Sequence, residues 1–557
     1  MEKFIWTQRY PEGISATVDI STHSSLTSLI DENLIKYKER DAFENFGKTI
    51  TFGELDRLSR NFGAYLQQEL GLQKGDRIAI DMPNLLQYPI ALVGALRAGL
   101  IVVNTNPLYT PREMEHQFKD SGVKAVVIVQ NFASNLQQII GNTEIKHVIL
   151  TQLGDMVGGL KGSIINFVVK RIKKMVPSFS LPDAISFKNA LKKGANLTLH
   201  EPEITPEDLA FLQYTGGTTG ISKGAQLSHG NLVAHTAILS EWFKPWMDPS
   251  KQETMITALP LYHIFALTVN GIHGINEGMK NVLITNPRDM PGFIKELMKH
   301  KMSLITGVNT LFNGLLNQPD FKSVDFSNLK GALGGGMAVQ DFVARKWNEV
   351  TGTPLIEGYG LSETSPVLCA NPMDGTHKIG SIGLPLSNTE VGIFDDDGNK
   401  LAQGEVGEIC ARGPQVMKGY WQRDNDGVFY DGGWFRTGDI GLMDEDGFFK
   451  IVDRKKDMIL VSGFNVYPNE VENVVADHPK VLEVAAIGVP HEKSVECVKI
   501  FVVKGDESLT EEELFEYCEK NLTGYKQPKY IEFRKELPKT NVGKILRRKL
   551  KEEEESK

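Results

Sequence analysis

Glycine, hydroxyl and lysine side chains gather in one short stretch of this chain, Tyr-Thr-Gly-Gly-Thr-Thr-Gly-Ile-Ser-Lys-Gly, at residues 214–224. Glycines let backbone N–H groups approach an anion closely, and hydroxyl and ammonium groups supply further donors to phosphate oxygens. The stretch therefore predicts a loop that binds a polyphosphate. The residues expected to form it are Tyr214, Thr215, Gly216, Gly217, Thr218, Thr219, Gly220, Ser222, Lys223 and Gly224.

Three better-known glycine-rich motifs fit the same stretch poorly. A Walker A loop places its lysine between glycine and Ser/Thr, whereas Lys223 follows Ser222 and precedes Gly224. The G-x-G-x-x-G pattern of dinucleotide-binding folds cannot be threaded through it. Residues 220–224 match the G-x-S-x-G elbow of hydrolases, but six Gly/Thr residues separate the serine from the preceding apolar segment. A flexible linker is disfavoured by the apolar flanks and by the lysine.

The segments on either side indicate where this loop lies. Residues 209–214 have the character of a strand end, and residues 228–239 have that of a helix. We therefore expect the loop at the edge of an α/β sheet, where such proteins usually bind nucleotides.

The loop resembles the phosphate-binding signature of the acyl-adenylate-forming enzymes, which include acyl-CoA synthetases, adenylation domains and luciferases. Further motifs follow in that family's order, at residues 357–364, 431–439, 453–457 and 537–547. The resemblance covers essentially all 557 residues, and it is closest to bacterial long-chain fatty-acid–CoA ligases. It implies activation of a fatty acid with ATP to an acyl-adenylate, followed by transfer to CoA, with Mg²⁺ as cofactor.

The resemblance also assigns roles within residues 357–364. It places Tyr359 on the adenine, the Ser362 hydroxyl at the α-phosphate and Glu363 on magnesium, with Gly360 among the nucleotide contacts. An aromatic face suits a base, and a carboxylate oxygen suits a magnesium ion that also needs phosphate ligands. Serine stands where the family commonly has threonine, and it keeps the hydroxyl.

Further roles come from the later motifs of the family. By the resemblance, Asp439 and Arg454 hold the ribose hydroxyls, and Lys544 is the catalytic lysine of the C-terminal loop. The same likeness puts the pivot of a domain rotation at Lys456 and places Gly463 beside the channel for the pantetheine arm of CoA.

Two more sites are expected to line the substrate pocket. Gly335 and Gly336 belong to a glycine run that allows close backbone approach to a ligand. His263 lies in the apolar run 258–267, where a lone histidine is more often a core residue. The family position favours instead a place at the carboxylate end of the acyl pocket, and residues 303–312 resemble the wall of the acyl tunnel.

Length and composition limit the class of protein. A chain of 557 residues exceeds what one core usually supports, and its net charge of −9 argues against a general nucleic-acid binder. Its four cysteines form no C-x-x-C pair, which disfavours a disulfide framework or a zinc site. The N-terminus lacks a signal-peptide core and no apolar run reaches the ~18 residues of a membrane span, so we expect a cytoplasmic protein.

The order of the predicted elements gives the fold class. Apolar strand-like runs alternate with helical patterns up to about residue 150, as in parallel sheets covered by helices. Short strands and Asp-Gly turns over 380–452 predict an antiparallel subdomain. We therefore expect an α/β protein whose N-terminal domain, 1–452, has two α/β sheets plus this subdomain. A hinge at 453–458 and a small mobile α+β lid domain at 459–557 follow.

Residues 161–176 form a basic amphipathic pattern that has two interpretations as a helix, although its β-branched content also permits a strand. Seven apolar residues share one arc of a helix, opposite Lys170, Arg171, Lys173 and Lys174. We favour a helix whose apolar face covers the core. The alternative is a helix that lies on an anionic membrane, which would place the protein on the inner face of the plasma membrane. The oligomeric state, a homodimer included, is left open.

Other functions share parts of this pattern. An adenylating enzyme with another acid or acceptor, such as an aryl-CoA ligase, a carrier-protein loader or a luciferase-like oxygenase, would keep the same ATP motifs. A non-catalytic nucleotide-binding or acyl-binding module is disfavoured by the presence of both Lys223 and Lys544.

Overall fold

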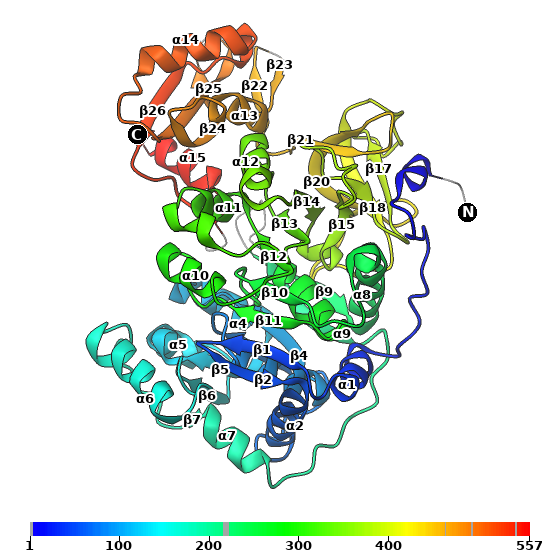
Figure 1. Cartoon of the computed structure of the whole chain (residues 1–557), viewed down its shortest axis with the longest axis vertical. Coiled ribbons are helices and arrows are strands. Elements are labelled where there is room, and N and C mark those ends of the chain that lie inside the picture. The colour runs from blue at the N-terminus through cyan, green and yellow to red at the C-terminus, as the bar shows by residue number, and fades with distance from the viewer. Residues whose placement is uncertain (1–3, 216–221, 463, 492–493, 541–542, 557) are drawn as a thin grey trace.

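The computed structural model describes residues 4–215, 222–462, 464–491, 494–540 and 543–556. Within these residues the strands form four sheets, three in a large N-terminal lobe and one in a small C-terminal domain (Figure 1). The predicted fold class is confirmed. Gly216, Gly217, Thr218, Thr219, Gly220 and Gly463 lie outside the described residues.

The first sheet of the lobe has seven strands, parallel except for the last pair. Their apolar runs are buried on both faces, which is typical of parallel sheets. The alternation of strands and helices predicted up to about residue 150 is confirmed. In order across the sheet they are β7 (Ile185–Ser186), β6 (His147–Thr151), β5 (Val123–Val129), β3 (Arg77–Asp81), β4 (Ile101–Thr105), β8 (Leu209–Thr215) and β9 (Lys223–Ser228).

The second sheet has nine strands, with a parallel centre and antiparallel pairs at both edges. One hydrophobic core contains side chains from both large sheets, so the two sheets form a single packed lobe. In order the strands are β16 (Leu384–Pro385), β15 (Val367–Ala370), β14 (Leu355–Gly360), β13 (Gly331–Gly335), β12 (Leu304–Gly307), β10 (Thr254–Thr257), β11 (Lys280–Leu283), β1 (Asp41–Asn45) and β2 (Lys48–Thr51).

Helices cover these sheets, and polar caps fix where several of them begin. The Thr51 hydroxyl accepts the backbone N–H of Glu54 at the start of α2, and Glu54 caps in return. The helices are α1 (Leu26–Lys36), α2 (Phe52–Gln68), α3 (Gln87–Arg97), α4 (Pro111–Ser121), α5 (Ala133–Ile139), α6 (Gly159–Phe167), α7 (Phe187–Gly194), α8 (His229–Phe243), α9 (His273–Asn276), α10 (Met290–Leu297), α11 (Asn309–Leu316) and α12 (Asp341–Thr351).

The predicted antiparallel subdomain is confirmed at one side of the lobe (Figure 1). Asp444 and Gly447 form the predicted turn between two of its strands, with Gly447 at φ +87°. The strands are β17 (Glu390–Phe394), β18 (Gly407–Arg412), β19 (Phe429–Tyr430), β20 (Trp434–Met443) and β21 (Phe449–Arg454).

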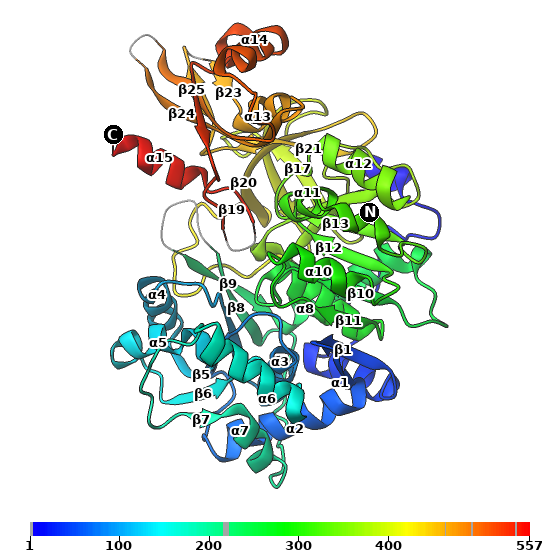
Figure 2. The ribbon, with the colours of Figure 1, turned by 60° about the vertical axis from the view of Figure 1, so that its left-hand side comes forward.

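The C-terminal domain has its own sheet and its own apolar core, as the α+β pattern predicts. Figures 1 and 2 show it above the lobe, next to β21. Its elements are β22 (Ile459–Val461), β23 (Phe464–Val466), α13 (Pro468–Ala476), β24 (Val481–His491), β25 (Val495–Lys504), α14 (Glu511–Asn521), β26 (Tyr530–Arg534) and α15 (Arg547–Glu555).

A short linker joins the lobe to this domain. Asp453 and Arg454 still pair with β20 as the end of β21, and β22 begins at Ile459. The Asp457 N–H donates to the Arg454 carbonyl oxygen at 2.9 Å, so Lys455 and Lys456 occupy the middle of a tight turn. The domain boundaries at 452 and 459, and a rotation at Lys456, stay predictions.

The favoured interpretation of residues 161–176 is wrong. The segment is helical, as α6 and a further turn at Val168–Ile172, but its apolar face does not cover the core. Leu160, Ile164, Phe167, Ile172 and Met175 are 52–78% exposed. α6 contacts the lobe through its other side, where Gly162 approaches Gly154 so closely that a Cβ would clash with backbone. In Figure 1 the helix lies at the outer edge of the lobe.

Candidate active site

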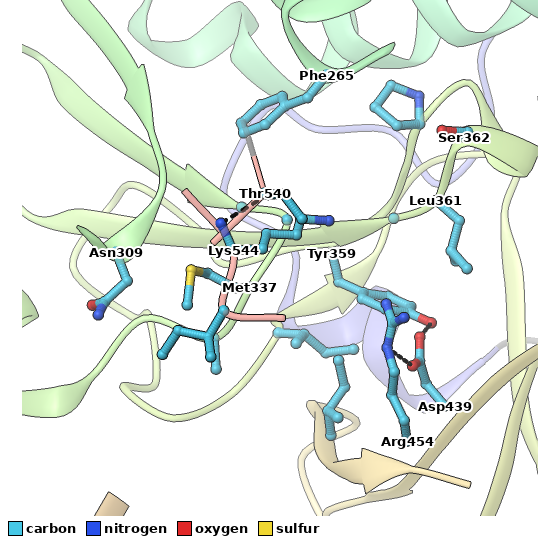
Figure 3. Close-up of a pocket in the computed structure, with 18 of the residues that line it drawn as sticks. Phe265, Asn309, Met337, Tyr359, Leu361, Ser362, Asp439, Arg454, Thr540 and Lys544 are labelled. Atoms are coloured by element: carbon cyan, nitrogen blue, oxygen red, sulfur yellow. Dashed lines mark hydrogen bonds and ion pairs between the residues drawn. The ribbon is translucent and has the colours of Figure 1, made fainter. Parts of the chain in front are cut away.

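A cavity of about 1990 Å³ opens between the lobe, the antiparallel subdomain and the C-terminal domain. Strand ends of both large sheets reach it, together with β20, β21 and the loop before α15. Motifs that are far apart in the sequence therefore meet in one place, and Figure 3 shows ten of the lining residues by name.

The phosphate loop connects the two antiparallel strands β8 and β9, in which Thr215 pairs with Lys223. The expected placement between a strand and a helix is wrong in this detail, because β9 precedes α8. The loop therefore does not lead into the N-terminus of a helix, and its described ends offer phosphate the hydroxyl and ammonium groups of Thr215, Ser222 and Lys223, which line the cavity.

Tyr214 and Gly224 pair across this hairpin, and Tyr214 also lines the cavity. The Tyr214 hydroxyl donates to Asp120 Oδ2 at 2.7 Å, and burial, followed by the Asp120 carboxylate, raises the pKa of that tyrosine. A Cβ at Gly224 would lie 3.0 Å from the Tyr214 ring. Their part in the loop is to hold its base.

Glu363 is fixed beside the phosphate loop by two hydroxyl groups. Tyr420 donates to Glu363 Oε1 at 2.7 Å, and the Thr215 hydroxyl lies 3.5 Å from the same oxygen. The Lys223 ammonium group lies 5.3 Å from the centre of the Tyr420 ring. Within the described residues Oε2 makes no hydrogen bond, so one carboxylate oxygen is available to a ligand.

Tyr420 is a residue that the sequence analysis missed. Its place is set by pairing between β9 and the segment that joins β18 to β19, where Ala225 bridges Tyr420 and the Trp421 N–H donates to the Gly224 carbonyl. A single tyrosine outside any motif gave no signal for this contact.

Three of the predicted nucleoside residues form one connected group (Figure 3). The Tyr359 hydroxyl donates to Asp439 Oδ2 at 2.7 Å, and Arg454 Nε lies 3.2 Å from Asp439 Oδ1. Tyr359 and Asp439 are buried, whereas the arginine side chain is 45% exposed. The group presents an aromatic ring, an acceptor and a donor to the cavity, as a base and a ribose require.

Lys544 reaches the same cavity from the loop that precedes α15. Its backbone N–H donates to the Thr540 hydroxyl at 3.0 Å, and Gly543 accepts a hydrogen bond from the Thr310 hydroxyl of the lobe at 3.3 Å. Burial, followed by the Arg454 charge, lowers the pKa of the Lys544 ammonium group to about 8. It is therefore mostly a cation at neutral pH.

Each of the predicted glycines avoids a different steric clash. A Cβ at Gly336, whose φ is +77°, would lie 3.1 Å from Lys544 Cε, so this glycine leaves room for the lysine. At Gly335 a Cβ would lie 2.9 Å from the Phe265 ring. At Gly360 it would lie 1.9 Å from the Pro366 carbonyl oxygen, so that glycine permits the packing of two chain segments. Ser362 lines the cavity and is half-buried.

His263 also lines the cavity. Its Nδ1 accepts the Phe265 backbone N–H at 3.3 Å, and burial, followed by the Lys544 charge, lowers its pKa to about 3. The imidazole is therefore neutral, with its proton on Nε2, and it can donate one hydrogen bond.

One continuous part of the cavity lining is apolar. Its buried walls come from α8, the helical turn at 266–272, β13, β14 and the segment around β16. Only Asn309 and Thr310 of the predicted wall at 303–312 line the cavity. The apolar lining that the sequence analysis missed comprises Leu239, Trp242, Phe243, Val269, Leu333, Ile356, Ile382 and Leu386.

Comparison with known proteins identifies the family. The AMP-binding enzyme family matches residues 30–421, and the AMP-binding enzyme C-terminal domain matches residues 470–544. The chain belongs to the AMP-binding enzyme family. A long-chain-fatty-acid–CoA ligase of Escherichia coli O157:H7 is 56% identical over 556 residues, which covers 100% of this chain and 99% of that protein.

Solved structures of one relative show which arrangement this chain resembles. ATP-bound MatB from Rhodopseudomonas palustris is 27% identical and superposes with a TM-score of 0.80, covering 95% of this chain and 98% of that one. Apo MatB is 28% identical, with a TM-score of 0.72 and the same coverage of both chains. The arrangement of this chain is therefore more similar to the ATP-bound structure.

Proposed function

We propose that this protein activates long-chain fatty acids with ATP to acyl-adenylates and then transfers the acyl group to CoA, releasing pyrophosphate and AMP. The observation that carries the proposal is the cavity, which joins a charged end for a nucleotide to an apolar end for an alkyl chain. The 56% identical ligase supports the same acid and acceptor. The buried wall around Trp242 and Phe243 offers an apolar surface for the acyl chain.

The first step requires a carboxylate to approach a triphosphate of the same sign. The fatty-acid oxygen attacks the α-phosphorus, the bond to the bridging oxygen breaks, and pyrophosphate leaves. Lys544 and Lys223 bring positive charge to this encounter, and the neutral His263 can donate a hydrogen bond to the acid. Catalysis is then positioning and charge stabilisation, without a covalent enzyme intermediate.

Glu363 is the residue that fits a magnesium ion. Its carboxylate is buried, is held by Tyr420 on one oxygen, and keeps the other oxygen free of hydrogen bonds from the described residues. Hard carboxylate and phosphate oxygens are the ligands that Mg²⁺ prefers. A bound ion would neutralise charge on the phosphates, while the protein orients Glu363.

The second step conflicts with the position of Lys544. The thiol of CoA must attack the acyl carbonyl, with AMP as leaving group, in the region that the lysine loop occupies during the first step. We propose that the C-terminal domain turns about the linker at 453–458, with Lys456 as pivot, and that Gly463 then approaches the pantetheine arm. A few linker residues can absorb such a rotation.

We propose a cytoplasmic protein that touches membranes through α6. None of the helices in the described ranges is long and apolar enough to cross a bilayer. The exposed apolar side chains of α6 and the following turn lie next to four exposed cations, at residues 170, 171, 173 and 174. Apolar and basic groups on one exposed helix favour an anionic lipid surface.

The experiment that tests the proposal measures the two steps separately. Palmitate-dependent ATP–pyrophosphate exchange reports acyl-adenylate formation, and mass spectrometry reports palmitoyl-CoA after CoA is added. With palmitate we expect both pyrophosphate exchange and palmitoyl-CoA formation. With benzoate we expect only weak pyrophosphate exchange. Exchange without acyl-CoA would indicate another acceptor, and preferred exchange with benzoate would indicate an aryl-acid enzyme.

A further inference from the structure

Arg547 is the centre of a buried charge cluster close to the catalytic loop. It is the first residue of α15 and follows Lys544 by three positions. Its Nη1 lies 3.3 Å from Asp453 Oδ1 and 3.4 Å from Asp457 Oδ2. Its Nη2 lies 2.6 Å from Glu472 Oε2, and its Nε donates to Glu472 Oε1 at 2.9 Å. The two donors to Glu472 form a bidentate pair.

The three carboxylates belong to different parts of the molecule. Asp453 lies on β21 of the lobe, Asp457 lies in the linker, and Glu472 lies on α13 of the C-terminal domain. Asp453 also accepts the Asn469 backbone N–H from α13 at 2.7 Å. One guanidinium group therefore ties the lobe and the C-terminal domain together across the linker.

The cluster lies out of water. The Asp453 side chain is 0% exposed, and those of Arg547, Asp457 and Glu472 are 15–16% exposed. Burial raises the pKa of Asp453 to about 6, and Arg547 opposes that shift. A buried carboxylate that loses its cationic partner is strongly destabilised, so these contacts depend on the arginine.

We propose that Arg547 is a positioning residue that locks the linker to the catalytic loop, holding Lys544 in the cavity for the first step and separating from Asp453 when the domain turns. This inference rests on the proposed two-step function. Only three peptide units separate the Cα atoms of Lys544 and Arg547, and Ile545, which lies between them, pairs with Lys539 in an antiparallel bridge. A displaced arginine therefore shifts the lysine as well.

The neighbouring residue provides a matched control. Arg548 carries the same charge, is exposed, and pairs with Glu552 within α15. Replacing it removes one positive charge from the same helix turn and leaves the contacts of Arg547 with Asp453, Asp457 and Glu472 in place.

The test compares Arg547→Gln, Arg547→Lys and Arg548→Gln in the two half-reactions. We expect Arg547→Gln to slow pyrophosphate exchange by about 100-fold, the usual cost of a small misplacement of a reacting group. Conversion of supplied palmitoyl-AMP to palmitoyl-CoA should stay close to wild type. Lysine at 547 keeps the charge and should restore part of the exchange, and Arg548→Gln should match wild type in both steps.

A second variant keeps the proposal testable if Arg547→Gln does not fold. Asp453→Asn removes the lobe's charge from the cluster and leaves the contact between Arg547 and Glu472 in place. It should therefore also slow pyrophosphate exchange while sparing the conversion of supplied palmitoyl-AMP. Equal losses in both half-reactions, or unchanged exchange in Asp453→Asn, would overturn the lock. The rates of the wild-type enzyme in the same assays test the proposed function. The role of Arg547 is tested separately, by the ratio of each variant's rate to the wild-type rate.

Discussion

The two halves of the active site are held in different ways. In the lobe, the Tyr359 hydroxyl of β14 donates to Asp439 of β20, and the Tyr420 hydroxyl donates to Glu363, which follows β14. The C-terminal domain supplies Lys544 on a loop that meets the lobe through single contacts such as the hydrogen bond to Gly543. Under the proposed function, we therefore expect the lobe half to hold its geometry through both steps and the other half to depend on where the C-terminal domain lies.

This difference indicates that nucleotide binding and the choice between the two half-reactions depend on different parts of the site. Changes in the lobe should weaken nucleotide binding, whereas changes in the C-terminal half should affect one half-reaction and spare the other.

The largest effect is expected for Lys544→Ala. Losing the cation should slow acyl-adenylate formation by about 10²–10³-fold, because charge stabilisation at the phosphate is removed. CoA attack on supplied acyl-adenylate should persist. Rapid-quench measurement of each half-reaction checks this, with the exposed Lys535→Ala as control. Comparable losses in both steps would refute the division between the halves.

Lys456→Pro sharpens the comparison at the linker. Proline fixes φ near −65° and disfavours the helical region at Lys455, so it should trap one arrangement of the domain. If the turn seen here tolerates proline, pyrophosphate exchange stays near wild type and acyl-CoA formation collapses; otherwise the reverse holds. Mild and equal effects on both half-reactions would mean that the linker does not pivot at this residue.

Asp439→Ala tests the lobe half. It removes an acceptor for the ribose and leaves the Tyr359 hydroxyl without its partner, so the ATP KM should rise by roughly ten- to a hundredfold. Tyr359→Phe is the matched control, since it keeps the ring and the aspartate. Steady-state kinetics with varied ATP measure both, and an unchanged KM in Asp439→Ala would contradict the assignment.

The pH dependence of the first step should follow Lys544. Its pKa is lowered to about 8, so the cation is present below that pH and is lost as pH rises through it. We expect kcat/KM for ATP to fall by about tenfold by pH 9, since this parameter reports groups of the free enzyme. Arginine at 544 should shift the decline to higher pH. A wild-type profile that stays flat to pH 9 would contradict the assignment.

The smallest effect on catalysis is expected for the residues that would attach the lobe to membranes, since such attachment would leave the C-terminal domain free to turn. Changing Lys170, Arg171, Lys173 and Lys174 to Gln should weaken binding to anionic vesicles by about 1 kcal/mol per charge. Activity on a soluble medium-chain acid should survive. Vesicle sedimentation measures the loss of binding, with Lys188→Gln on α7 as control. If the fraction of protein bound to vesicles does not change, α6 does not bind membranes.

The motif residues could be predicted because each answers a local requirement of chemistry or backbone. Gly336 must leave room for Lys544, and Tyr359 and Glu363 sit on one short segment. The apolar wall could not be predicted, because Trp242, Leu333 and Ile382 come from separate elements whose contacts only packing decides.

The sequence also could not separate a covered helix from an exposed one. α2 and α6 both carry an apolar arc, yet α2 buries Leu55, Phe62 and Leu66, while α6 exposes Ile164 and Phe167. Periodicity reports that an apolar face exists and not what covers it. The strand β9 was missed for a similar reason, since its pairing with β8 is set by register across the phosphate loop.

The polarity of the cavity has a practical consequence. With lysines and carboxylates at one end and Trp242, Phe243 and Leu386 at the other, it orients any single-tailed anion as one leaflet of a bilayer does. An alkyl sulfate or alkyl phosphate detergent has the same gradient along its length. Such surfactants are therefore expected to occupy the site as competitors of the fatty acid, so enzyme preparations should avoid them and crystallographers could use them as probes.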